Sequence, residues 1–194
     1  MKPPKTHPLF PSHPHPPPSC FFAYIDGAAR GNPGPAAYGV VFRNSDEELV
    51  ANLGRTIGET TNNVAEYHGL LAALDYAHEH ALRALKIFSD SELLVRQLRG
   101  EYKVKSPDLK PLHERARALI AKLDFFDIAA VPRERNRDAD RLANQALDRV
   151  RGRIAPAREE EIRIEAVYEK GVLKPTRKLA LPEGTRVRVI LRRK

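Results

Sequence analysis

Short apolar runs alternate with turn-forming residues through the first third of the chain. Apolar runs begin at Phe21, Tyr38 and Leu49, and the polar run NSDEE separates the second run from the third. Runs of this length, bounded by turn residues, are typical of β-strands. We therefore expect a meander of three antiparallel strands in this part of the chain.

The apolar spacing then changes from that of a strand to that of a helix. Five residues between positions 61 and 82 recur at the spacing of one helix face: Val64, Tyr67, Leu71, Leu74 and His78. This pattern predicts a helix with one buried side. Thr61 or Asn62 is of the residue type that caps a helix start.

Strand and helix patterns alternate through the rest of the main region. We expect strands at 85–90 and 124–131, and helices at 91–100, 108–123 and 138–150. Gly100 is expected to end the first of these helices and Pro132 the second strand. In the last helix, Leu142, Ala146 and Val150 are expected to face inward. The order of elements predicts an α/β fold in which a mixed sheet carries helices on its faces.

The two ends of the chain differ from its middle. Residues 1–19 hold eight of the 16 prolines, which predicts an extended or disordered leader, either a passive tail or a ligand for a partner's groove. The main domain is expected at 20–151, followed by a polar linker at 152–161. Residues 162–194 alternate with a period of two around a PEG turn, which predicts a small β appendage that must dock or self-associate to be stable.

Composition limits the kinds of binding partner and the cellular compartments that suit this protein. The 194 residues carry 33 Lys and Arg against 25 Asp and Glu, a net charge of +8 that fits a polyanionic partner but is weak evidence alone. The lone cysteine, Cys20, excludes an intrachain disulfide and fits the cytoplasm. The sequence has no apolar run of membrane-spanning length and no apolar core of a signal peptide at its start.

Four acids stand where the predicted elements begin or end. Asp26 and Asp90 each end an apolar strand, and their carboxylates would converge if the two strands are neighbours. Glu66 lies one turn inside the first helix, and Asp140 lies near the start of the last. Each acid alone can also be structural, because strand ends and helix N-termini tolerate or favour acids. Two clustered carboxylates would repel each other, and a divalent cation would relieve that repulsion.

An all-oxygen ligand set selects Mg²⁺ or Mn²⁺ over Zn²⁺. Two such ions roughly 4 Å apart can activate water and stabilise the leaving oxygen of a phosphodiester. Such chemistry needs no side-chain nucleophile, and we find no obvious Ser–His or Cys–His arrangement in the sequence.

Four segments resemble ribonuclease H type 1 in order and spacing: YIDGAARGNPGPAAYG, TTNNVAEYHGLLAAL, IFSDSELLVRQL and VPRERNRDADRLANQAL. The resemblance covers roughly Phe21 to Val150. It implies a ribonuclease H-like five-stranded mixed sheet, three antiparallel strands then two parallel, flanked by helices. It also implies endonucleolytic cleavage of the RNA strand of RNA/DNA hybrids with Mg²⁺ or Mn²⁺, two ions per site. The products would carry 5′-phosphate and 3′-hydroxyl ends.

The same resemblance assigns the four acids as metal ligands. Asp26 would bridge both ions, Asp90 would hold one, and Glu66 would hold the other while touching a ribose 2′-hydroxyl. Asp140 would complete the site on the water side. Asp138 is a neighbouring acid, but Asp140 is the Asp of the Ala–Asp pair in the family's motif, so we prefer Asp140.

Polar residues near these acids resemble the family's contacts to the hybrid. Asn32, Asn62 and Asn63 resemble its polar contacts and Thr61 its phosphate anchor, although Asn32 also suits a turn and Thr61 a helix cap. Gly27, Gly31 and Gly34 are expected to let the backbone approach nucleic acid.

The KVKSP segment, with Lys105 and Ser106, resembles the family's DNA-side loop. Ser106 replaces an Asn found in many members, which weakens that contact. Eight basic residues between 96 and 122 form a candidate phosphate-tracking surface, or simply a solvated face: Arg96, Arg99, Lys103, Lys105, Lys110, Arg115, Arg117 and Lys122.

The chain departs from many family members before the last helix, where the mobile loop and its His are missing. We expect Arg133 or Arg135 to replace that His in part, with Arg135 as the named candidate. The basic protrusion that carries Trp in some members is also absent, because the chain has no Trp.

The C-terminal segment resembles a family of small, β-rich, antitoxin-like proteins through VYEKGVLKP and LPEGTRVRV. It could add affinity for nucleic acid, mediate self-association or simply pack. The alternative function for the chain is therefore a nucleic-acid-binding or antitoxin-like interaction protein without catalysis.

Overall fold

The computed structural model describes residues 15–150, 166–169 and 172–176. The chain divides into two units, Met1–Pro156 and Ala157–Lys194, and each is described by itself. None of the helices in the described ranges is long and apolar enough to cross a membrane.

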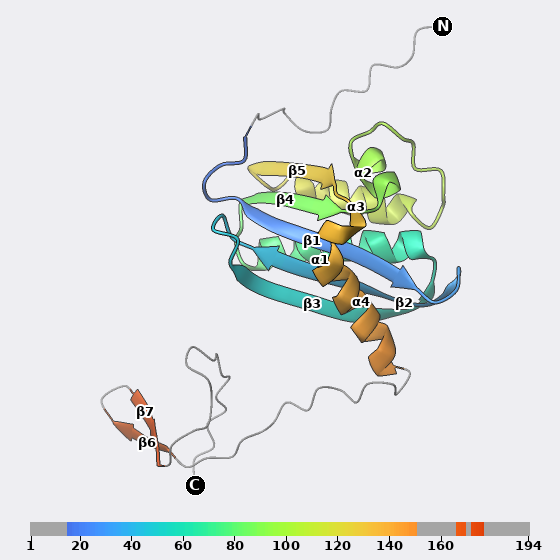
Figure 1. Ribbon diagram of the computed structural model, residues 1–194. Helices are drawn as coiled ribbons and strands as arrows, with labels where there is room; N and C mark the ends of the chain where they lie inside the picture. Colours follow the sequence, from blue (N-terminus) through green and yellow to red (C-terminus); the bar gives the residue numbers. More distant parts are fainter. Residues whose placement is uncertain (1–14, 151–165, 170–171, 177–194) are drawn as a thin grey trace, which may run out of the picture. The chain divides into compact units, whose positions relative to one another are not determined.

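The larger unit contains the expected five-stranded mixed sheet (Figure 1). Its strand order is β3-β2-β1-β4-β5. The first three strands pair antiparallel, and β4 and β5 extend the sheet in parallel. The strands run over β1 (Phe21–Ala29), β2 (Gly34–Arg43), β3 (Leu49–Thr60), β4 (Ala84–Ser89) and β5 (Phe125–Ala130). The fold class predicted from the sequence is confirmed.

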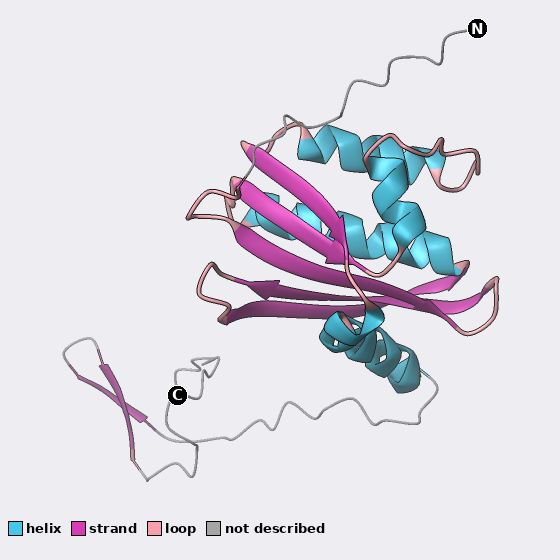
Figure 2. Cartoon of the chain, turned by 45° about the horizontal axis from the view of Figure 1, so that its top comes forward, coloured by secondary structure: helices cyan, strands magenta, loops and turns pink. Residues whose placement is uncertain are grey.

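Helices cover both faces of the sheet, as Figure 2 shows. On one face lie α1 (Asn62–Glu79), α2 (Glu92–Leu98) and α3 (Lys110–Ile120). On the other lies α4 (Arg137–Val150), which follows the short 3-10 helix η1 (Arg133–Arg135). Thr61 caps α1 through its hydroxyl, which accepts from the backbone N–H of Val64 at 3.4 Å. Gly100 follows α2 with a φ of 75°, a conformation that favours glycine.

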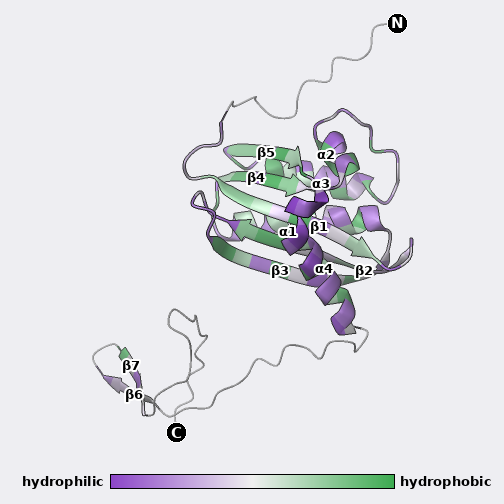
Figure 3. Ribbon diagram, in the orientation of Figure 1, coloured by the Kyte–Doolittle hydropathy of each residue, from purple (hydrophilic) through white to green (hydrophobic). Residues whose placement is uncertain are grey.

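The main core lies between the sheet and α1–α3. Its largest fully buried side chains include Tyr67, Phe42, Ile25, Leu70 and Leu74. Each such side chain contributes roughly 1.5–3 kcal/mol of burial free energy. Figure 3 shows the contrast between the apolar strands of this sheet and the hydrophilic outer surface of α4.

The opposite face is packed with small residues. Ala37, Ala146 and Leu147 form a minor cluster there, with Ala28 beside it. A Cβ on Gly39 would lie 2.1 Å from the carbonyl oxygen of Ala139, so the backbone of α4 approaches β2 directly. Glycine at this position therefore sets how closely α4 approaches the sheet.

The inward side of α4 differs from the prediction. Ala139, Ala143, Ala146 and Leu147 are buried, whereas Leu142 is only half-buried. The close approach at Gly39 places the small residues inward, because there is little room for a larger side chain. Val150 was also expected to face inward, but its side chain lies outside the part of the chain that the structure describes.

The start of the chain and the smaller unit are described in part. The backbone N–H of Cys20 donates to the carbonyl of Pro17, and Cys20 is buried just before β1, while residues 1–14 lie outside the described part. In the smaller unit, β6 (Ala166–Glu169) and β7 (Val172–Pro175) form an antiparallel hairpin. The predicted PEG turn and the strand at 185–194 lie outside the described residues.

Candidate functional site

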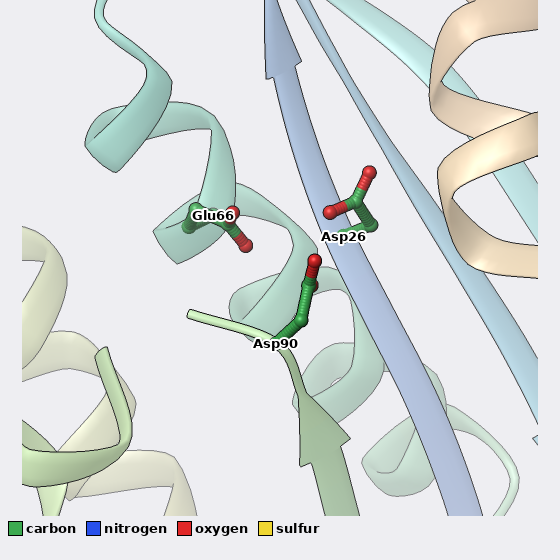
Figure 4. A group of neighbouring side chains, drawn as sticks. All are labelled: Asp26, Glu66 and Asp90. Atoms are coloured by element: carbon green, nitrogen blue, oxygen red, sulfur yellow. The ribbon is translucent and has the colours of Figure 1, made fainter. Parts of the chain in front are cut away.

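Three of the four candidate acids meet beside the middle of β1, where β4 ends (Figure 4). Asp26, Glu66 and Asp90 each offer a carboxylate oxygen, and these oxygens all lie within 4.8 Å of one another. Glu66 comes from α1, and Asp90 directly follows β4, as expected of a strand end. Asp26 lies within β1, which continues to Ala29, so the expectation that Asp26 ends its strand is wrong. Because Ile25 pairs with Ser89 in the parallel ladder, the next residue on each strand is one of these acids.

Gly27 brings the helix that carries Glu66 against the strand that carries Asp26. A Cβ at Gly27 would lie 2.2 Å from the backbone N of Glu66 and 2.5 Å from the carbonyl carbon of Ala65. Packing within the protein therefore requires glycine here, and the approach of nucleic acid to this backbone stays a prediction. Gly31 and Gly34 are constrained in the same way, because an added Cβ would meet the carbonyl oxygens of Pro33 and Arg30 at 2.9 and 2.3 Å.

Burial makes this cluster unfavourable for free carboxylates. The side chains of Asp26 and Glu66 are each only 5% exposed. Loss of solvation first, and then the charges of Asp90 and Asp140, raise the pKa of Asp26 from its ordinary 3.8 to about 7. The pKa of Glu66 is raised well above its usual range by burial first and then by Asp26 and Asp90. Without a cation, the folded protein therefore resists full ionisation of the cluster.

The donor set fits a hard divalent cation. All three groups are carboxylates, which are the ligands that Mg²⁺ and Mn²⁺ prefer. The Oε2 atom of Glu66 is buried and has no hydrogen-bond partner in the described part of the chain. A buried acceptor without a partner is costly, and a cation shared with Asp26 and Asp90 would satisfy it.

Asp140 lies beside this group but not within it. Its Oδ1 accepts from the Arg133 guanidinium at 2.8 Å, and its charge contributes to the raised pKa of Asp26. Asp138, the alternative acid, instead pairs with Arg43 at 3.3 Å and with Arg141 at 3.0 Å. The preference for Asp140 over Asp138 therefore agrees with the electrostatics of the site.

Asn136 is a site residue that the sequence analysis missed. Its side chain is 1% exposed, and its amide donates to the carbonyl of Ile25 at 2.8 Å and to Oδ1 of Asp90 at 2.7 Å. In the sequence, Asn136 is the first residue of the NRDAD segment, and an Asn just before a helix is typical of a loop. A polar residue before a helix gives no sign that it will be buried.

Four of the predicted substrate contacts gather around the start of α1. Asn32, in the loop between β1 and β2, accepts through its Oδ1 from the backbone N–H of Asn62 at 3.2 Å. Thr61 caps the helix, and both Asn62 and Asn63 are exposed. A hydrogen bond from the Asn62 side chain opposes the rise in the pKa of Glu66. The β1–β2 loop, the helix start and the acids are thus connected through a few hydrogen bonds.

The remaining predicted contacts lie on other loops. Lys105 is exposed and Ser106 half-buried in the segment between α2 and α3, and Arg135 is exposed in η1. Of the eight basic residues proposed to follow phosphates, three make contacts within the protein. Arg96 pairs with Glu92, Arg115 pairs with Asp75, and Arg99 donates to the carbonyl of Ile128.

Comparisons with known proteins agree with the fold. Residues 24–146 match a family profile described as reverse transcriptase-like, and residues 160–194 match one described as AF2212-like. A protein named ribonuclease HI from Halobacterium salinarum is 48% identical over 126 residues, covering 65% of this chain and 63% of its own length. The chain thus matches less than two thirds of that relative.

Solved structures extend the comparison. The crystal structure of RNase H1 from Halobacterium salinarum NRC-1 matches with a TM-score of 0.65 and 46% identity, covering 66% of this chain and 98% of that one. LC11-RNase H1 in complex with an RNA/DNA hybrid matches with a TM-score of 0.64 and 38% identity, covering 67% and 98%. With this fold, this identity and the acids beside the middle of β1, the chain belongs to the type 1 ribonuclease H family.

Proposed function

We propose that the protein is an endoribonuclease that hydrolyses the RNA strand of RNA/DNA hybrids, leaving 5′-phosphate and 3′-hydroxyl ends. The observation that carries the proposal is the set of three carboxylates within 4.8 Å of one another, two of them buried, in a ribonuclease H fold. A similar protein, LC11-RNase H1, has been solved with an RNA/DNA hybrid bound. The alternative, a binding protein without catalysis, gives no reason to bury two acids beside a third.

The proposed catalytic and metal-binding residues are Asp26, Glu66, Asp90 and Asp140. When bound, two Mg²⁺ or Mn²⁺ ions would supply an activated water and stabilise charge on the phosphate and the leaving oxygen. The protein's own part is to hold the acids in place before substrate arrives. It does so by joining β1, α1 and β4 where β4 ends and by keeping Asp26 and Glu66 away from bulk water.

Substrate binding is proposed to begin at the loop and helix start beside the acids. Asn32, Thr61, Asn62 and Asn63 would contact the hybrid there, close to Glu66. Two of them already hold the backbone in place, since Asn32 accepts from the N–H of Asn62 and Thr61 caps α1. Lys105 and Ser106 would contact the DNA strand from the α2–α3 segment, and salt would weaken the phosphate contacts.

An Arg is proposed to take over part of the role of the missing His, and the geometry favours Arg133. Both arginines are exposed, but the Arg133 guanidinium donates to Asp140 at 2.8 Å, whereas no described ion pair joins Arg135 to an acid of the site. Arg133 also lowers the pKa of Asp26 through its charge. Arg135 keeps the role of a proposed substrate contact.

The remaining proposals concern organisation. We propose a leader at 1–19, a catalytic domain at 20–151, a linker at 152–161 and an antitoxin-like β appendage at 162–194, in a cytoplasmic protein. The β6–β7 hairpin supports a need for a partner, because Val167, Tyr168 and Val172 are at least half exposed. A two-stranded hairpin is marginally stable by itself, so docking or self-association is proposed for this unit.

The test is cleavage of labelled RNA/DNA hybrid, RNA duplex and DNA duplex, each with Mg²⁺ and with Mn²⁺. We expect the RNA strand of the hybrid alone to be cut, and Asp26→Asn to lower the rate at least ~100-fold. Asp124→Asn is the matched control, because that acid is exposed and paired with Arg83. An inactive parent chain would refute the function, and an active Asp26→Asn would refute the assignment of this acid.

A further inference from the structure

Asn136 connects three elements that carry acids. It lies between η1 and α4, and its side-chain amide reaches the carbonyl of Ile25, the residue before Asp26. The same amide nitrogen donates to Oδ1 of Asp90 at 2.7 Å. Its backbone carbonyl accepts from the N–H of Asp140 at 3.1 Å, in the first turn of α4. One residue is thus bonded to the strand of Asp26, to Asp90 itself and to Asp140.

These bonds restrict how Asp90 can move. Asp90 follows the last residue of β4, where the sheet's ladder no longer holds the chain. A hydrogen bond from a buried amide to Oδ1 restricts the orientation of that carboxylate. Hydrogen-bonded partners of this kind orient the ligands of metal sites.

We propose that Asn136 is a positioning residue that holds Asp90 and the start of α4 in register with β1, so that the acids can share a cation. The inference rests on the proposed metal-dependent function. It is separate from the ligand assignments, because Asn136 acts through Asp90 and not on the metal. The donor is essential to this role, since Asp90 and Ile25 both present acceptors to the same nitrogen.

If Asn136 only stabilised the fold, its loss would lower thermal stability without changing metal binding. Gln97 provides the comparison: it is also a buried amide, 6% exposed, and its Oε1 accepts from the Tyr67 hydroxyl at 2.9 Å. Gln97 lies on α2 and none of its described hydrogen bonds reaches an acid of the site. Loss of either amide should lower thermal stability, but only the loss of Asn136 should change metal binding.

The experiment is titration of the full chain with Mn²⁺, with free Mn²⁺ followed by electron paramagnetic resonance. Parent, Asn136→Ala and Gln97→Ala are compared below their melting temperatures. We expect Asn136→Ala to weaken Mn²⁺ binding about 10- to 100-fold and Gln97→Ala to leave it within about twofold. If Asn136→Ala does not fold, Asn136→Ser serves, because a serine hydroxyl is too short to reach both acceptors.

Hydrolysis kinetics give the second measurement. With saturating metal, kcat of the Asn136 variant should fall while KM for the hybrid stays near that of the parent. Parent-like Mn²⁺ binding by Asn136→Ala would overturn the inference, as would a parent chain that binds no Mn²⁺. A parent that binds Mn²⁺ but cuts no hybrid would refute the proposed function alone, and the binding titration would still decide the role of Asn136.

Discussion

The two faces of the sheet hold their acids by different means. On the α1 face, Glu66 lies on a helix whose other residues fill the main core, with Leu70 and Leu74 fully buried. On the α4 face, Asp140 lies on a helix that meets the sheet through small residues. Asp26 and Glu66 are buried by this arrangement, whereas the Asp140 side chain is 30% exposed and paired with Arg133.

This difference predicts a division between a fixed and an adjustable part of the site. A large apolar core resists displacement, because each shift of a buried side chain loses many contacts. The α4 side has fewer such contacts and depends on close backbone approach at Gly39. We therefore expect Asp140 to be the acid whose position responds most to changes in packing.

The strongest test of this comparison is to separate α4 from the sheet. In Gly39→Ala, the new Cβ would lie 2.1 Å from the carbonyl oxygen of Ala139, so the helix must move. We expect a loss of about 3 kcal/mol in the free energy of unfolding, together with a fall in kcat. Gly54→Ala is the graded control, because its nearest contact to α4 is 3.1 Å. Urea unfolding and hybrid cleavage measure both effects, and equal results for the two variants would contradict the argument.

The next test removes the adjustable acid. Asp140→Asn is expected to lower kcat about 10- to 100-fold, which corresponds to roughly 1.4–2.7 kcal/mol of transition-state stabilisation. The loss should be smaller than for Asp26→Asn, because Asp140 lies outside the group of three. Asp138→Asn, two residues away and paired with Arg43 and Arg141, should keep the parent's rate. If Asp138→Asn lowered kcat and Asp140→Asn did not, the catalytic acid would be Asp138 and not Asp140.

Much of this organisation could be predicted from the sequence, and the exceptions share a cause. The strand and helix patterns predicted the order of elements, because periodicity reports which side of an element is buried. The α4 face was predicted less well: Leu142 was expected inward, but the contact at Gly39 admits only small side chains. That contact joins residues a hundred positions apart, and no local pattern reports it.

The site shows the same limit. Asp26 and Asp90 were expected to meet at two strand ends. They do meet, through the parallel pairing of β1 with β4, although β1 continues past Asp26 to Ala29. The packing role of Gly27 against the backbone of Glu66 was not predicted, because it joins residues far apart in the chain. Asn136 was read only as part of a motif, since its burial depends on three elements that meet in space. Contacts between residues far apart in the chain decide these positions, and a single sequence does not show such contacts.

A third test compares the buried acids with and without metal. The pKa of Asp26 is raised from 3.8 to about 7, so the folded protein binds a proton that the unfolded chain releases between those values. The metal-free protein should therefore lose stability as pH rises from about 4 to about 7, by roughly 3–4 kcal/mol. Asp26→Asn should flatten this dependence, and Mg²⁺ should restore stability at pH 7 and above. Chemical denaturation across pH measures it, and stability that rises over this range in the metal-free parent would contradict the proposed burial cost.

The smallest expected effect concerns Arg133. Its ion pair with Asp140 involves an Arg side chain that is 74% exposed, so Arg133→Ala should change stability little. Its effect should fall on turnover, with kcat reduced about 3- to 10-fold, because a lost charge near the phosphate removes some transition-state stabilisation. Arg135→Ala should act mainly on KM, as expected of a substrate contact, which separates the two arginines. If Arg135→Ala lowers kcat more than Arg133→Ala does, then Arg135 and not Arg133 stabilises the transition state. The Arg133–Asp140 contact would then be only a surface ion pair.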